Sequence, residues 1–191
     1  MPVAAPTRKG PDVETSPIAW KTVSGIKSGD RPLVLWIADP ILDLPVEHRA
    51  FDDTDVRLAS HAFRLARISP AVAKLDPILE AYARSGPALL VFAPDLSRAT
   101  ILYGSTLDAR TVLEASRGFA STYLRLDLDA SVLRARTLLA EQRTLTDERT
   151  TLAGAASSEA EATRRQARVT AIDARILAIG TEVEGLFHAR A

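Results

Sequence analysis

The sequence predicts an α/β domain followed by a long helical extension. Between residues 18 and 124, strand-like apolar runs alternate with helix-compatible segments, and Gly and Pro stand at the joints. From residue 126 to residue 191 there is no proline, and almost every residue favours or tolerates a helix. Residues 1–17 instead carry four prolines among charged and small residues, which predicts an extended arm. A chain of 191 residues is long enough for one compact domain with an appendage.

Composition excludes several classes of function. Lys plus Arg and Asp plus Glu number 24 each, so the net charge gives no reason to favour nucleic acid or an anionic membrane as partner. The chain has no cysteine, which excludes disulfides, thiolate metal sites and thiol–disulfide exchange. No run approaches the ~18 apolar residues of a membrane span. No apolar segment follows Arg8 and Lys9 as it would in a signal peptide, so we expect a cytoplasmic protein.

Four apolar runs predict the strands of a sheet. Residues 33–37 are continuously apolar after a turn that contains Gly and Pro, which is typical of a central strand buried on both faces. Residues 63–68 predict a second strand. Residues 88–92 and 100–103 predict two more, and the loop between them is short enough for an antiparallel hairpin.

Helix signals lie between and after these strands. Residues 45–62 are helix-compatible after an entry that contains Pro. Residues 76–77 (Asp-Pro) predict the start of another helix with Ile78 on its apolar side, because an acceptor side chain precedes Pro at the first helical position. Residues 105–108 have the Ser-x-x-acid form of a capping box before a third helix. The predicted order is strand, helix, strand, helix, strand, strand, helix.

Particular residues within this order resemble the thioredoxin-like proteins. An Ile-Ala-Trp segment at residues 18–20 precedes the turn Gly-Asp-Arg-Pro at 29–32 and the first central strand. Residues 51–56 resemble the segment after that family's active site, and residues 86–92 resemble its cis-proline strand. Tyr-Gly at 103–104 resembles the end of its hairpin. The resemblance covers about 105 of the 191 residues and implies a three-layer α/β/α domain over 18–124, ahead of a helical hairpin or coiled-coil tail over 126–191.

The chain departs from that family at the redox motif. In such domains Cys-x-x-Cys follows the first central strand, at the amino end of a helix that stabilises a thiolate. Here residues 38–45 read Ala-Asp-Pro-Ile-Leu-Asp-Leu-Pro, which places Ile41 and Leu44 at the sulfur positions. The resemblance therefore implies a redox-inactive member with no catalytic residue. Asp39 and Asp43 could form an acid/base pair, but carboxylates at a strand-to-helix turn are more often caps.

Gly86 and Pro87 form the second candidate site. The resemblance implies a cis peptide bond before Pro87, with neighbouring backbone groups free to pair with an extended peptide. The alternative is that Gly-Pro only ends a helix and begins a strand.

No residue pattern predicts a metal or cofactor. His48, His61 and His188 lie far apart in sequence and match no metal-ligand spacing. The Arg164, Arg165 and Arg168 cluster is expected to be a solvated helix face, with contact to nucleic acid or phosphate as the less favoured alternative.

The tail carries an apolar stripe at 3-4-3-4-3 spacing, which places its members on one side of a helix and indicates association with another helix. The stripe comprises Val169, Ile172, Ile176, Ile179, Val183 and Leu186. Leu138, Leu145 and Leu152 recur every seven residues in a different register, with Gly154 and a second capping-box pattern between the two sets. These features favour a helical hairpin, although one Gly does not exclude a single long helix.

The sequence thus predicts a non-catalytic thioredoxin-like protein-interaction or scaffold module without cofactor. Its helical tail would mediate self-association or docking to a protein partner, with no membrane and no nucleic acid involved. Two alternatives stay open: a glutathione transferase-like or glutathione-binding protein, and a structural subunit of a larger assembly.

Overall fold

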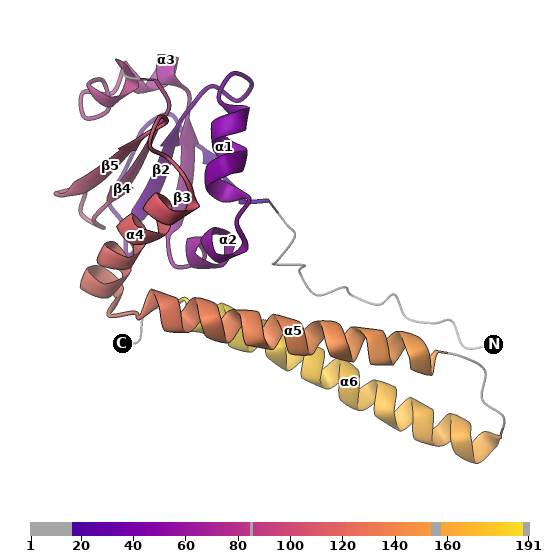
Figure 1. Ribbon diagram of the computed structural model, residues 1–191. Coiled ribbons are helices and arrows are strands. Elements are labelled where there is room, and N and C mark those ends of the chain that lie inside the picture. The colour runs from indigo at the N-terminus through magenta and orange to yellow at the C-terminus, as the bar shows by residue number, and fades with distance from the viewer. Residues whose placement is uncertain (1–16, 85, 154–157, 189–191) are drawn as a thin grey trace.

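A computed structural model describes residues 17–84, 86–153 and 158–188, and shows a five-stranded sheet flanked by helices together with a long two-helix hairpin (Figure 1). Residues 1–16 of the predicted arm, residue 85, residues 154–157 and the last three residues lie outside this range. The described chain is therefore mixed α/β with six α-helices, of which the last two are long and consecutive.

The sheet has the strand order β1-β3-β2-β4-β5. β1 pairs in parallel with β3, and β3 in parallel with β2, whereas β4 is antiparallel to both β2 and β5. The strand bounds are β1 Lys21–Thr22, β2 Leu33–Ile37, β3 Arg64–Ile68, β4 Ala88–Phe92 and β5 Ala99–Tyr103. β2 and β4 coincide with predicted strands, β3 and β5 differ from theirs by one residue, and β1 was not predicted.

β2 and β4 form the centre of the sheet. Every residue of both strands is buried, because apolar layers cover both faces. The Trp36 side of the sheet packs under helices α1, α2 and α4, whereas Leu35 and Leu90 face the short helix α3 and the loops around it. This two-sided burial explains why these strands read as uninterrupted apolar runs.

The predicted helix over 45–62 is two helices, α1 Leu44–Phe51 and α2 Thr54–Ser60. The break falls at Asp52 and Asp53, because the Asp53 carboxylate accepts hydrogen bonds from the backbone N–H groups of Asp55 and Val56 and so begins a new helix. Helix propensity alone did not reveal this internal cap.

The helix predicted to begin at residues 76–77 is wrong. A four-residue helix α3 (Pro70–Ala73) lies earlier, with Ser69 as its N-cap, and a 3₁₀ turn η1 (Tyr82–Arg84) lies later. The Asp76 carboxylate does accept from the N–H of Ile78, but it closes a local turn and not a helix. Leu79 is buried, whereas Ile78 is exposed.

The N-cap of the following helix, α4 (Ala109–Phe119), lies three residues later than predicted. Asp108, not Ser105, is the N-cap: its carboxylate accepts from the N–H of Thr111 while the Thr111 hydroxyl accepts from the N–H of Asp108. A π-helical turn, η2 (Ala120–Leu124), continues α4 and ends at Arg125 in the left-handed conformation, which turns the chain into the hairpin.

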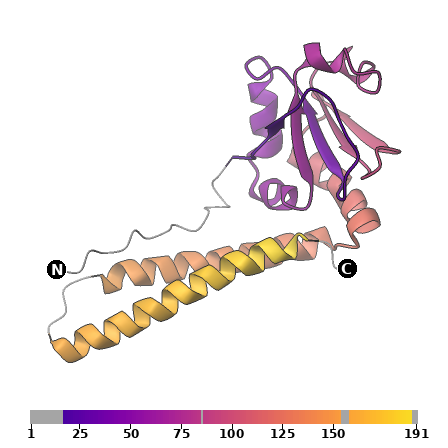
Figure 2. The same ribbon diagram turned by 180° about the vertical axis from the view of Figure 1, so that it is seen from behind.

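The tail is a hairpin of two antiparallel helices, α5 (Leu128–Leu152) and α6 (Glu159–Leu186), as the sequence favours. At ~1.5 Å per residue they are about 38 and 42 Å long. The hairpin crosses one end of the α/β part and extends well beyond it in both views (Figures 1 and 2). Ser158 caps α6 by accepting from the N–H of Glu161, as its capping-box pattern predicts.

Ion pairs fix the register of the two hairpin helices. Arg134 Nη2 lies 3.6 Å from Glu182 Oε2, Glu141 Oε1 lies 2.7 Å from Arg175 Nε, and Glu148 Oε1 lies 2.6 Å from Arg168 Nε. On each helix these members are seven residues apart, so the pairs form a ladder along one flank of the apolar seam. Each exposed pair contributes little, but opposite charges at three successive levels favour this register over a shifted one.

The base of the hairpin belongs to the same core as the sheet. Leu138 from α5, Ile179 and Val183 from α6, and Phe187 just beyond α6 are buried in one cluster with Trp36 of β2. The ring of Phe187 is fully buried and lies 5.9 Å from the ring of His61 at the end of α2. Two ion pairs also join α5 to the α/β part: Arg136 Nη1 lies 3.5 Å from Asp55 Oδ1 of α2, and Arg117 Nε of α4 lies 2.8 Å from Asp129 Oδ1.

Phe187→Ala is expected to lower the free energy of unfolding by about 3–5 kcal/mol, because it opens a cavity where the hairpin joins the sheet core. Leu177→Ala on the same hairpin is the control: that side chain is 75% exposed, so the change should stay within about 0.5 kcal/mol. Denaturant unfolding measures both. Equal losses in the two variants would contradict a shared core.

Candidate interaction surfaces

The turn between β2 and α1 is held by the two carboxylates that the sequence left open as an acid/base pair. Asp39 Oδ1 accepts from the backbone N–H of Ile41 at 2.8 Å and of Leu42 at 3.0 Å. Asp43 Oδ2 accepts from the N–H of Asp39 at 2.7 Å. The N–H groups of Leu42 and Ile41 lower the pKa of Asp39 below its usual value. Both carboxylates therefore accept hydrogen bonds from backbone N–H groups within the turn, although Asp43, the N-cap residue of α1, makes no side-chain hydrogen bond to that helix.

This turn displays apolar side chains to solvent. Ile41 is 80% exposed and Leu42 is 79% exposed, and Leu44 at the start of α1 is also exposed. Isolated exposed apolar residues are ordinary, but three within four positions on a fixed turn form a local apolar surface. Ile41 and Leu44 were predicted as candidate site residues from the missing redox motif, whereas Leu42 was not predicted.

Gly86 and Pro87 lie at the same end of the sheet as this turn. β4 runs antiparallel to β2, so that Ala88, next to Pro87, pairs with Ile37 at the last position of β2. The structure places no cis peptide bond among the residues it describes, so the bond before Pro87 is trans and the expected cis geometry is wrong. The Pro87 carbonyl accepts from the N–H of Gly104 at 2.8 Å, which closes the β4–β5 pair.

Gly104 is required by close packing against Pro87. A Cβ atom at residue 104 would lie 2.6 Å from Cγ of the Pro87 ring, nearer than side-chain carbons approach. Gly86 has φ +85°, in the left-handed region that glycine adopts without strain. These two glycines give the Gly-Pro and Tyr-Gly motifs a reason in local geometry.

A second exposed apolar pair follows β3. Leu75 is 83% exposed, and Ile78 is more than half exposed. Because β3 runs parallel to β2, this loop lies at the same end of the sheet as Ile41 and Leu42, on the far side of α3 (Figure 1). No local sequence signal marks these residues, since apolar residues beside a predicted helix are normally assigned to the core.

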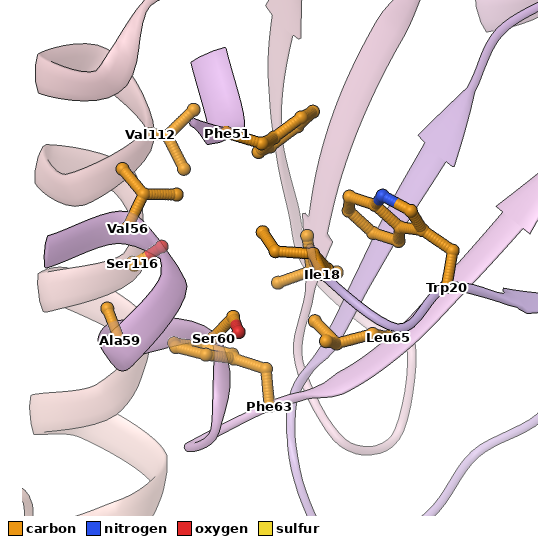
Figure 3. Close-up of a pocket in the computed structure, with 11 residues that line it drawn as sticks. Ile18, Trp20, Phe51, Val56, Ala59, Ser60, Phe63, Leu65, Val112 and Ser116 are labelled. Atoms are coloured by element: carbon orange, nitrogen blue, oxygen red, sulfur yellow. The ribbon is translucent and has the colours of Figure 1, made fainter. Parts of the chain in front are cut away.

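A narrow hollow opens on the opposite side of the sheet from α3, beneath Ile18 and Trp20. Apolar side chains from the sheet, α1, α2 and α4 line it, together with Ser60 and Ser116 (Figure 3). It has room for about one water molecule, far less than a cofactor needs. The Trp20 and Trp36 rings both pack edge-on to Phe51, at 5.1 and 5.4 Å between ring centres. The hollow is a gap in side-chain packing.

The three histidines do not converge. All three are exposed: His48 Nδ1 lies 2.7 Å from Asp52 Oδ2, His188 lies at the end of the hairpin, and one side of the His61 ring packs on Phe187. Partial desolvation of the ring against Phe187 lowers the pKa of His61, and the negative charge of Glu184 opposes this shift. Within the described ranges, no group of three or more His, Asp or Glu side chains could hold a metal ion.

The predicted association stripe lies on the α5 side of α6. Ile172, Ile179 and Val183 are fully buried within this chain, and Val169, Ile176 and Leu186 are partly buried. The Arg164, Arg165 and Arg168 cluster lies toward the far end of the hairpin. Arg165 pairs with Glu161 and Arg168 with Glu148, which matches a solvated helix face.

A comparison of the chain with family models, with curated proteins and with solved structures finds no match. In the part of the chain that the structure describes, no helix has both the length and the apolar character to cross a membrane.

The contact between His61 and Phe187 is expected to weaken in acid. Because partial desolvation lowers the pKa of folded His61, the unfolded chain binds the proton more readily, and stability falls slightly as the pH drops below about 6.5. Melting temperatures between about pH 7.5 and 5.5 should therefore fall more for the wild type than for His61→Gln. His48→Gln removes an exposed imidazole and should retain the wild-type loss. Identical pH profiles for the wild type and His61→Gln would show that His61 is not desolvated in the fold.

Proposed function

We propose that this protein is a non-catalytic interaction module of the thioredoxin-like type, which binds a protein partner at the β2–α1 turn and carries a stiff helical arm. The partner would present an extended apolar segment to Ile41 and Leu42. Without cysteine, the module has no side chain that can exchange a disulfide.

The order of elements supports the thioredoxin-like assignment. A buried central strand, a helical segment, a parallel strand, a short helix, an antiparallel strand pair and a last helix follow one another as the resemblance implies. The turn with Ile41 and Leu42 stands where the family places its redox motif, and Pro87 stands at the adjoining strand.

The observation that carries the binding function is the fixed display of Ile41 and Leu42. Their backbone N–H groups are bonded to Asp39, so the turn loses little conformational freedom when a partner covers it. Burying an exposed Ile or Leu fully contributes roughly 1.5–3 kcal/mol, so two of them supply useful affinity. Two hydrophobic side chains on an ordered turn are suited to binding and carry no group for catalysis.

The helical arm supports a scaffold role. Its apolar base is fused with the sheet core, and its ion-pair ladder fixes the helix register, so the arm is held at a set angle to the binding turn. A structural subunit of a larger assembly would use the same features. The glutathione-binding alternative has no comparable support, because the helices project away from the sheet and leave the β2–α1 turn uncovered (Figure 1).

The double variant Ile41→Asp with Leu42→Asp should lose partner binding and keep its fold, because both side chains are exposed in the free protein. Peptides of about 12 residues selected from a displayed library against the wild type provide the ligands. Their dissociation constants should rise at least about ten-fold in the double variant. Leu133→Asp, an equally drastic change at an exposed leucine of α5, is the control and should bind as the wild type does. Selection of no peptide, or equal affinity in all three proteins, would refute this function.

A further inference from the structure

The outer edge of β5 is open. β5 is the last strand of the sheet, and in both views no other element lies along its outer side (Figures 1 and 2). Its backbone pairing with β4 shows which groups face outward. Ala93 N–H donates to the Arg98 carbonyl at 2.9 Å, and Gly104 N–H donates to the Pro87 carbonyl at 2.8 Å.

Hydrogen-bonded positions alternate along an antiparallel pair, so residues 98, 100, 102 and 104 direct their backbone groups toward β4. Ala99, Ile101 and Tyr103 direct theirs outward. The Tyr103 carbonyl accepts from the N–H of Thr106 at 2.9 Å. Among the described residues, nothing pairs with the N–H groups of these three residues or with the carbonyls of Ala99 and Ile101.

The two edge strands of the sheet, β1 and β5, differ in how well they resist pairing with a strand of another chain. β1 has only two residues, one of which is Lys21, and a short charged strand is a common way to block an edge. β5 has five residues, Ala-Thr-Ile-Leu-Tyr, without charge or proline. An open edge of this composition is a template for another strand.

We propose that β5 pairs with β5 of a second copy of this chain, antiparallel about a two-fold axis at Ile101. The two Ile101 residues then exchange their N–H and C=O groups, and the Tyr103 N–H of each copy donates to the Ala99 carbonyl of the other. This surface is separate from the β2–α1 turn and from the hairpin, so the inference goes beyond the proposed function.

The side chains of β5 fit a copy of themselves. The two-fold axis places Ala99 opposite Tyr103, Thr100 opposite Leu102 and Arg98 opposite Gly104, a smaller residue facing a larger one in each pair. Arg98 is the one charged residue among them, and it meets Gly104, so no like charges oppose each other. The symmetric pairing uses both open edges and closes at the dimer.

The dimer should be weak. A five-residue strand edge covers less area than the roughly 1,200 Å² of a standard stable interface. Sedimentation velocity from about 1 µM to 1 mM should therefore show a concentration-dependent shift from one chain to two.

Ile101→Pro and Ile101→Val form a matched pair for the test. Proline removes an N–H that faces away from β4, so the β4–β5 ladder keeps its bonds while the central bonds of the dimer are lost. We expect its dissociation constant to rise at least about ten-fold, whereas Ile101→Val keeps the wild-type value. Ala99→Pro, at the first residue of the strand, should act in the same direction and serves if Ile101→Pro fails to fold.

Hydrogen exchange of the wild type gives a readout without substitution: the Ile101 amide should be protected at high concentration and exchange freely on dilution. A wild-type chain that stays monomeric at the highest concentration would overturn the proposal. A dimer that persists unchanged in the folded proline variants, or an Ile101 amide indifferent to concentration, would do the same, and would place any association on the hairpin or the β2–α1 turn.

Discussion

The apolar core that continues from the sheet into the base of the hairpin is the contact on which the rest of the molecule depends. Trp36 in the central strand and Phe187 at the end of α6 belong to one buried cluster, although 150 residues separate them in sequence. Because α6 returns to the core, the hairpin is anchored both at the start of α5 and at the end of α6. The length of the arm beyond the core is then supported by helix pairing alone, with the ion-pair ladder fixing its register.

The positions of β2 and β4 could be predicted from the sequence because a strand whose two faces are both buried consists of an unbroken run of apolar residues. Helix boundaries were less predictable. Asp53 and Asp108 became N-caps, whereas Asp76 closed only a turn and Ser105 did not cap α4, although both residue types suit an N-cap. The choice among such sites depends on where the tertiary structure turns the chain, and local pattern does not carry that information.

The candidate site was partly predictable for a related reason. Ile41 and Leu44 could be selected as candidate surface residues because they occupy the positions of the Cys-x-x-Cys motif that the chain lacks. Leu42, Leu75 and Ile78 have no such marker in the sequence, although they are exposed. An apolar residue is normally assigned to the core, and its exposure is a property of the folded surface. The open edge of β5 is similar, since which strand lies last in the sheet follows from pairing between distant segments.

Exposed apolar side chains and unpaired backbone groups determine where this protein can associate with another chain. The apolar stripe of α6 was the strongest association signal in the sequence, but Ile172, Ile179 and Val183 are already covered by this chain, so burying them stabilises the fold and adds little to an intermolecular contact. Free energy of association can come only from groups that the fold leaves uncovered. Among these are the exposed apolar side chains of the β2–α1 turn and the unpaired backbone of β5, which lie on different parts of the α/β region. Binding at one therefore leaves the other free, and a dimer formed through β5 would present two copies of the turn to a partner, raising its effective affinity without any new contact.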